Sequence, residues 1–167
     1  MTVEEPFDPL LSFAEIERLV ARIYFRFSHL FLAQLEQRDF WWEMGKEEER
    51  HAEILQACRA LIENFPEPVL DASISRDKAQ QLSLRLNAFL AQGTASLTVD
   101  EAFRIAVEIE SSEIDAIYSK LIHLGGEEVA RTMENLGVPA SVQRHKLKAA
   151  LRRFCTSAEL LAAAERL

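Results

Sequence analysis

Residues 44–62 read MGKEEERHAEILQACRALI and place a carboxylate and an imidazole, Glu48 and His51, three positions apart. Residues three or four apart share one face of a helix. Counting in such steps gives a stripe that is otherwise apolar, as a buried face should be: Met44, Glu48, His51, Leu55, Cys58 and Ile62. A carboxylate in an apolar interior has to be paired, protonated or bound to a metal.

An inward-facing Glu-x-x-His unit is the ligand pattern of carboxylate-bridged dimetal sites in helical bundles. The alternative is a solvated patch, because residues 47–50 form a charge run. The metal hypothesis therefore requires further carboxylates on the matching faces of other helices.

The neighbouring helices carry such carboxylates. A capping box, Ser12-x-x-Glu15, predicts a helix over residues 12–37 with Glu17 on its apolar stripe. The Glu48 helix should then run over residues 39–64, with Asp39 as its cap and prolines just beyond its end.

A third long helix is predicted over residues 98–124, opened by a Thr-x-x-Glu capping box and ended by two glycines. Glu110 lies on its apolar stripe, and Glu113 lies on the adjoining turn. With His51, and His145 further along the chain, the predicted helices carry four inward carboxylates and two histidines. The negative charges of the four carboxylates would balance the charge of two divalent ions. Without metal, these converging charges would destabilise an apolar bundle.

The rest of the chain completes an all-α prediction. An amphipathic helix over residues 76–92 lies between the second and third long helices, which makes it a candidate crossover. Helical patterns also cover residues 127–136 and 140–154, and a short helix should follow a cap at Thr156. Residues 1–11 should be an irregular lead-in and residues 66–75 a connection. We interpret residues 1–167 as a single domain.

Composition supports this interpretation and excludes several functions. The chain has 167 residues, 49% of them hydrophobic, with only five Gly and five Pro, which favours helices over disorder. A net charge of −8 argues against binding nucleic acid or anionic membranes. Cys58 and Cys155 form no Cys-x-x-Cys motif, so no rubredoxin-type or zinc-ribbon site is expected. An acidic N-terminus without a signal pattern, and the lack of a long apolar segment, predict a cytoplasmic protein.

The chain resembles the rubrerythrin group of ferritin-like proteins over roughly residues 12–155. In that family the first helix carries a Glu with a Tyr seven residues later, as in Glu17 and Tyr24 here. The second helix carries Glu-x-x-His, as in Glu48 and His51. The third carries Glu-x-x-Glu with a Tyr eight residues after the first Glu, matched here by Glu110, Glu113 and Tyr118.

This resemblance implies a ferritin-like four-helix bundle with a crossover helix and a short C-terminal helix. It implies two divalent metal ions, iron in the first place, with manganese or zinc as alternatives. Glu17 and Glu110 would be terminal ligands, Glu48 would bridge, and His51 would be terminal. Glu113 would stabilise the oxidised state, so Glu48 and Glu113 are the expected catalytic residues.

The fourth ligand-bearing helix departs from the family, which has a second Glu-x-x-His there. This chain reads Val142-Gln143-Arg144-His145, so His145 is kept and Val142 replaces the bridging Glu. Helical phase places His145 roughly 150° from the apolar Leu147, unless the Gly137-Val138-Pro139 break rotates the helix. We expect one metal position to be weaker, more open to water, or empty.

The expected function is an oxidoreductase acting on peroxide, dioxygen or ferrous iron. The alternative is a metal-binding or structural bundle without competent two-metal redox chemistry, and a third possibility is an oxygen-dependent hydroxylase on the same scaffold. We expect a homodimer that uses a separate electron-donor protein, because the family's rubredoxin module has no counterpart here.

Overall fold

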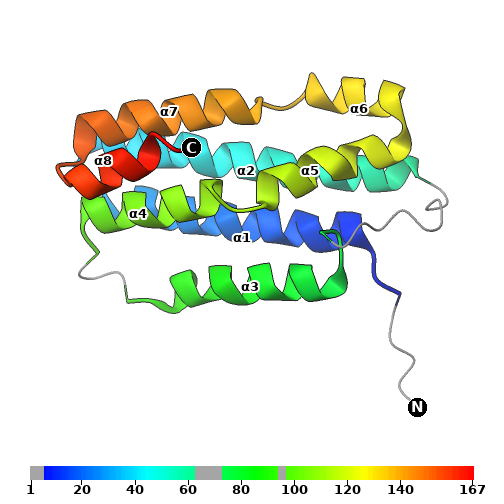
Figure 1. Ribbon diagram of the computed structural model, residues 1–167, viewed down its shortest axis with the longest axis horizontal. Helices are drawn as coiled ribbons and strands as arrows, with labels where there is room; N and C mark the ends of the chain where they lie inside the picture. Colours follow the sequence, from blue (N-terminus) through cyan, green and yellow to red (C-terminus); the bar gives the residue numbers. More distant parts are fainter. Residues whose placement is uncertain (1–5, 63–72, 94–96) are drawn as a thin grey trace, which may run out of the picture.

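The computed structural model describes residues 6–62, 73–93 and 97–167, and every regular element within these ranges is helical (Figure 1). The elements in chain order are α1 (Pro9–Leu30), α2 (Leu35–Leu61), α3 (Arg76–Ala91), α4 (Val99–Glu110), α5 (Ile114–Ile122), the 3-10 helix η1 (His123–Gly125), α6 (Glu127–Glu134), α7 (Ala140–Phe154) and α8 (Ala158–Ala164). The all-α prediction is thereby confirmed for the described residues.

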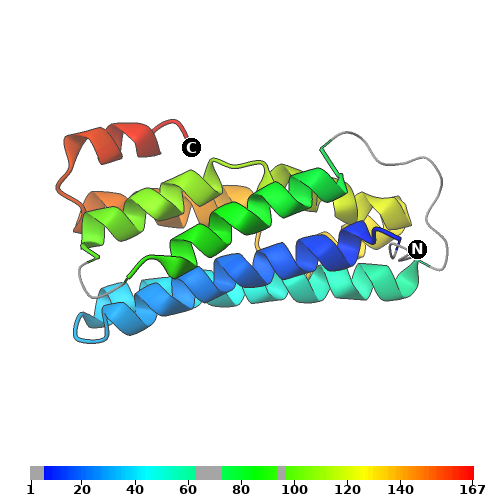
Figure 2. The ribbon, with the colours of Figure 1, turned by 90° about the horizontal axis from the view of Figure 1, so that it is seen from below.

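The axes of the helices are roughly parallel or antiparallel to one another (Figures 1 and 2). α1 and α2 pack side by side in opposite directions, and α4 and α5 follow one another along the same axis, as do α6 and α7 (Figures 1 and 2). α3 lies on the outside against α1 and returns the chain, so that α2 and α4 run in the same direction. α2 contacts α1, α5, α6 and α7, which places its Glu48 and His51 face at the centre of the molecule.

The first helix begins and ends earlier than the sequence predicts. Asp8, not Ser12, is the N-cap: its Oδ1 accepts a hydrogen bond from the Leu11 N–H at 3.1 Å, and Pro9 occupies the first helical position. The turn to α2 lies at residues 31–34, which contain neither Gly nor Pro and therefore gave no breaking signal. The predicted end of the second helix at residues 63–64 and most of the connection at 66–75 lie outside the described residues.

The third long helix is interrupted, which corrects the prediction of one continuous helix over residues 98–124. Its start is as expected, because Thr98 and Glu101 form the reciprocal capping box. α4 ends at Glu110, and residues 111–113 separate it from α5. The Ser111 hydroxyl donates to the Val107 carbonyl at 2.6 Å, and the Ser112 hydroxyl accepts from the Ile114 N–H at 3.4 Å. Two serines thus compete with the helix for its own backbone groups.

An aromatic core fastens one end of the molecule. Trp41 of α2 is fully buried, with ring centroids 5.0 Å from Phe27, 5.7 Å from Tyr24 and 4.6 Å from Phe103 of α4. The adjacent Trp42 is 50% exposed. Burial of these rings joins α1, α2 and α4 and fixes the lengthwise register of the helices that carry the central carboxylates.

Among the described residues, no helix combines the length and apolar character needed to cross a membrane.

Candidate metal centre

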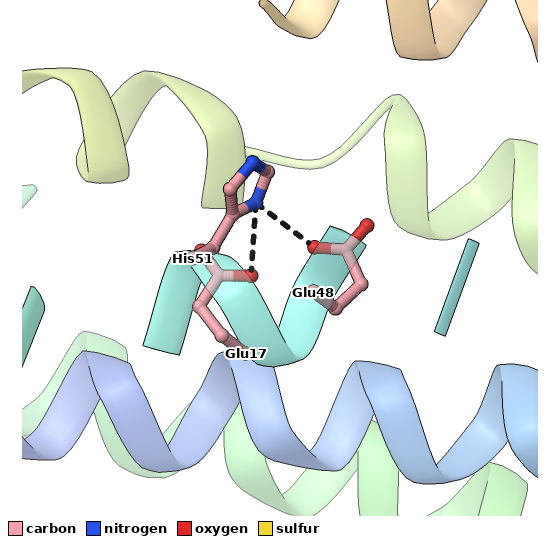
Figure 3. Close-up of side chains that lie close together, drawn as sticks. All are labelled: Glu17, Glu48 and His51. Atoms are coloured by element: carbon pink, nitrogen blue, oxygen red, sulfur yellow. Dashed lines mark hydrogen bonds and ion pairs between the residues drawn. The ribbon is translucent and has the colours of Figure 1, made fainter. Parts of the chain in front are cut away.

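Glu17 of α1 and Glu48 and His51 of α2 point toward one another in the interior (Figure 3). His51 Nδ1 lies 3.1 Å from Glu48 Oε2 and 3.9 Å from Glu17 Oε2. One potential ligand atom from each of the three side chains falls within 4.8 Å of the other two. All three residues are almost completely buried, between 1% and 3% exposed. The sequence predicted these three as ligands, and the structure brings them together.

Helical spacing explains this convergence. Glu48 and His51 are three residues apart, so their side chains leave the same face of α2. That face is turned toward α1, whose own buried stripe presents Glu17. The polar residues sit among apolar neighbours, including Val20, Met44 and Leu55, which are all at most 1% exposed. Water is thereby kept from the carboxylates.

The electrostatics of this group are unfavourable without a cation. Burial raises the pKa of Glu17 well above its ordinary value of 4.5, and the nearby negative charge of Glu48 raises the pKa further. For His51, burial alone would lower the pKa, but the hydrogen bond and charge of Glu48 outweigh burial and the net pKa is raised. The metal-free site therefore retains protons that a metal ion would displace.

One buried carboxylate oxygen without a hydrogen-bond partner indicates that the site suits a metal ion. Glu17 Oε2 is fully buried and has no hydrogen-bond partner among the described residues. Buried carboxylate oxygens normally find a donor, so an orphaned one facing a second carboxylate and an imidazole suits a cation. Mixed carboxylate and imidazole ligands suit iron, manganese or zinc. This buried group can therefore hold a metal ion.

The Val138 backbone, in the α6–α7 connection, also raises the pKa of His51. Nδ1 of His51 faces Glu17 and Glu48 and is the nitrogen available to a metal shared with these carboxylates.

Glu110 of α4 shares the interior but stands outside this three-residue group. It is 4% exposed, and its Oε1 accepts a hydrogen bond from the Tyr24 hydroxyl at 2.6 Å. Burial, followed by the charges of Glu48 and Asp115, raises the pKa of Glu110 well above its ordinary value. Tyr24 is fully buried, so it also packs in the core.

The structure does not bring Glu113 or His145 to the centre. Glu113 lies in the break after α4, where its side chain is 59% exposed and forms an ion pair with Lys78 at 2.6 Å. His145 is exposed on α7, as is Val142, which is 44% exposed. The break removes Glu113 from the helical phase of Glu110, and the Gly137-Val138-Pro139 connection does not turn His145 inward. The prediction that Val142 takes the place of a bridging Glu is likewise corrected.

Gln143 is the α7 residue that faces the centre, and sequence reasoning missed it. It is fully buried, and its amide Nε2 donates a hydrogen bond to Glu48 Oε1, while its own Oε1 has no partner among the described residues. The signal was present: Gln143 lies four residues before Leu147 and eight before Leu151, the buried leucines of α7. The resemblance to the family's Glu-x-x-His spacing instead predicted that Val142 and His145 occupy the ligand positions.

Asp115 is the second missed residue. Its side chain is 14% exposed and forms an ion pair with Arg144 at 3.3 Å. Burial, followed by the charge of Glu48, raises the pKa of Asp115, whereas Arg144 opposes this shift. Asp115 lies in the first turn of α5, just after the break at Ser111 and Ser112. The break changes the rotation of the helix, so one continuous helix would not have predicted that Asp115 points inward. Glu47, the first residue of the charge run 47–50, is also buried and pairs with Lys146.

Family models, curated proteins and solved structures were all compared with the chain, and none matches it. The functional argument therefore rests on the residues themselves.

Proposed function

We propose that this chain is a ferritin-like, rubrerythrin-like metal protein and an oxidoreductase acting on peroxide, dioxygen or ferrous iron. The observation that carries this proposal is the buried convergence of Glu17, Glu48 and His51. The order of the helices supports the ferritin-like assignment, because α3 occupies the place of the crossover between the α1–α2 pair and the later helices.

The residues of the centre would bind the metal, supply a proton and exclude water. Two ionised carboxylates, Glu17 and Glu48, would neutralise one divalent ion, and neutral His51 would add a nitrogen ligand through Nδ1. Bound iron or manganese would supply electron exchange with the oxidant. The Tyr24 hydroxyl donates a hydrogen bond to Glu110 Oε1 at 2.6 Å, and this pair would hold a proton for a reduced oxygen species. The apolar surroundings exclude bulk water.

The proposal favours one firmly held ion and a weak second position. A second ion would need the Oε1 side of Glu48, where the Gln143 amide donates its hydrogen bond. A neutral donor there replaces the negative ligand that a second cation requires. Glu110 and Asp115 are close enough to Glu48 for its charge to raise their pKa values, and they are the further carboxylates that a second ion would depend on. Gln143 is also the observation that favours the other candidate function, a metal-binding bundle without competent two-metal redox chemistry.

Metal content tests the site. Protein purified without added metal should contain about one iron or manganese ion per chain. Glu48→Ala removes a central ligand and should lose most of that metal, whereas Glu53→Ala, on the exposed side of α2, should keep it. Equal metal content in the two variants would contradict the site.

Oxidant response separates the two candidate functions. Adding peroxide to the reduced, metal-loaded protein should change the metal's absorbance, and a reductant should restore it. A bound metal that does not respond to peroxide or dioxygen would support the non-redox alternative instead.

The remaining parts of the proposal concern assembly and partners. We propose a cytoplasmic homodimer that receives electrons from a separate donor protein. Leu32, Leu35 and Trp42 are between 50% and 60% exposed near the α1–α2 turn and offer an apolar surface for such a dimer. Sedimentation of the purified protein tests the dimer, and a monomer at all concentrations would contradict it.

A further inference from the structure

A cavity of about 390 Å³ lies between α5 and the connection from α6 to α7. Its lining includes His51 and Asp115 on the side of the metal centre, Tyr118 and Ser119 from α5, and Glu134 and Asn135 from the end of α6. The cavity therefore extends from His51, a proposed metal ligand, to residues of α5 and α6 that have no role in the proposed redox reaction.

The cavity touches the centre through one aromatic pair. The Tyr118 ring lies against the His51 ring, with centroids 4.5 Å apart and planes tilted by 33°. Val138, in the connection from α6 to α7, also lines the cavity. A molecule in this space would contact the Tyr118 ring, which lies against a proposed metal ligand.

The volume exceeds the needs of a small oxidant. Water occupies about 30 Å³ in the liquid, and peroxide is only slightly larger. Cavities that bind organic ligands have volumes of roughly 300–1,000 Å³, and this one falls at the lower end of that range. Its size therefore fits a small organic molecule.

The charges of the lining select the kind of molecule. Two carboxylates, Asp115 and Glu134, line the cavity, and none of the described lining residues is Lys or Arg. Asp115 already has Arg144 as its partner at 3.3 Å. Glu134 has a more distant partner, the half-exposed His123, whose Nε2 lies 3.9 Å from Glu134 Oε1. Glu134 is therefore the carboxylate open to a ligand, and the face of Tyr118 suits a cation or an aromatic ring.

We infer that this cavity binds a small organic amine in its cationic form, with its apolar body against Tyr118 and Val138 and its ammonium group toward Glu134. This inference deepens the proposed function, since it names the class of molecule that would occupy the space beside the metal centre. Binding itself does not require the metal.

Three probes of similar size and different charge test the inference: benzylamine, benzyl alcohol and benzoate. Each is titrated into the full-length chain, with chelator and with bound metal, while amide shifts are followed by NMR. Benzylamine should bind most tightly and should shift the amides of residues around the cavity. Equal or tighter binding of benzyl alcohol or benzoate, or no binding of benzylamine, would overturn the inference.

Matched variants locate the binding. Glu134→Gln should weaken benzylamine by about two- to fivefold, the range expected for a half-exposed ion pair, and should leave benzyl alcohol unchanged. Glu128→Gln, an exposed change on the same helix, should affect neither probe. Ser119→Phe should fill the cavity and block benzylamine, whereas Ala116→Phe, exposed on α5 outside the lining, should not. Circular dichroism checks that each variant is folded, and equal benzylamine affinity across all four would overturn the location.

The outcomes distinguish this inference from the proposed function. Metal binding without benzylamine binding would overturn the cavity assignment and leave the metal centre intact. Benzylamine binding by a chain that takes up no metal would overturn the metal centre and leave the cavity assignment standing. If both hold, benzylamine should also perturb the absorption of bound Co²⁺, because the cavity touches His51.

Discussion

At the scale of single residues, our proposal makes the α7 side chain that faces Glu48 the one that determines how many ions the centre would hold. Gln143 offers an amide donor to Glu48 Oε1, where a carboxylate would offer negative charge. The difference is small in volume, because Gln and Glu have nearly the same shape. Its electrostatic consequence is large in a buried site, where each additional charge needs a counter-charge.

Replacing Gln143 with Glu should therefore create the second metal position. We expect Gln143→Glu to raise bound iron or manganese from about one to about two ions per chain at saturating metal. Gln56→Glu adds the same charge on the exposed face of α2 and should leave the ratio unchanged. Elemental analysis of both variants checks this, and an unchanged ratio in Gln143→Glu would show that α7 does not control the second position.

The protons held by Glu17 and Glu110 predict how the metal-free protein responds to pH. Their pKa values in the folded chain are raised above the ordinary 4.5. The folded state therefore binds protons more tightly than the unfolded state. The resulting stabilisation is complete below about pH 4.5 and is lost as the pH rises through the raised values.

Thermal unfolding in the presence of chelator measures this effect. Above the acid range, the contribution of the two groups should fall as the pH rises, and metal affinity should increase because fewer protons have to be displaced. Glu17→Gln should flatten the dependence, since it removes one of the two titrating groups. Metal affinity that is constant with pH would contradict the assignment of these residues.

At the scale of secondary structure elements, adjacent residues at the start of α2 have opposite roles. Trp41 is fully buried between α1 and α4, and Trp42 is half exposed beside Phe25, with ring centroids 4.9 Å apart. Trp41 therefore belongs to the core, and Trp42 belongs to the surface. Helical phase decides between the two, because neighbouring residues point about 100° apart.

Truncation of these two residues should give very different results. Trp41→Ala should lower the free energy of unfolding by about 3–5 kcal/mol, because it leaves a large cavity among packed aromatic rings. Trp42→Ala should lower it by less than about 1.5 kcal/mol, since half of the side chain is already in water. Denaturant unfolding measures both values, and similar losses would contradict the packing described for this end of the molecule.

The elements also show what the sequence could and could not predict. Apolar stripes identified the helices and placed Glu17, Glu48, His51 and Glu110 on buried faces, because a stripe needs only local spacing. The break at Ser111-Ser112 could not be read in this way, since either serine is tolerated in a helix. A single continuous helix gives the wrong rotation for the residues after the break. The prediction therefore placed Glu113 inside and did not include Asp115.

The α7 assignment failed for a different reason. Gln143 lies on the same buried face as Leu147 and Leu151, but the prediction followed the resemblance to a family with Glu-x-x-His, which favoured Val142 and His145. A motif gives the spacing of residues along a helix, but it does not show which face of the helix points inward. The apolar stripe shows that face, and in α7 the buried face is the one that carries the leucines.

At the scale of the whole molecule, a bound ion should stabilise the fold, because the unfolded chain cannot present three ligands from two helices. A ligand at about one hundred times its Kd stabilises the folded state by about 2.7 kcal/mol. For a chain of 167 residues this corresponds to an increase in Tm of roughly 5–10 °C. Melting curves with Mn²⁺ and with chelator measure the increase.

Two variants determine whether that increase arises at the proposed centre. His51→Ala should abolish it, and His145→Ala, an exposed change on α7, should preserve it. An increase in Tm that persists in His51→Ala would place the stabilising ion elsewhere on this acidic chain, whose net charge is −8.

The central claim is that a cation binds where Glu17, Glu48 and His51 meet, and anomalous diffraction from crystals grown with Mn²⁺ or Fe²⁺ tests it most directly. The predicted result is an anomalous peak about 2.0–2.2 Å from a carboxylate oxygen of each glutamate and from His51 Nδ1. Well-ordered side chains with no peak among them, or a peak only at surface carboxylates, would contradict the account.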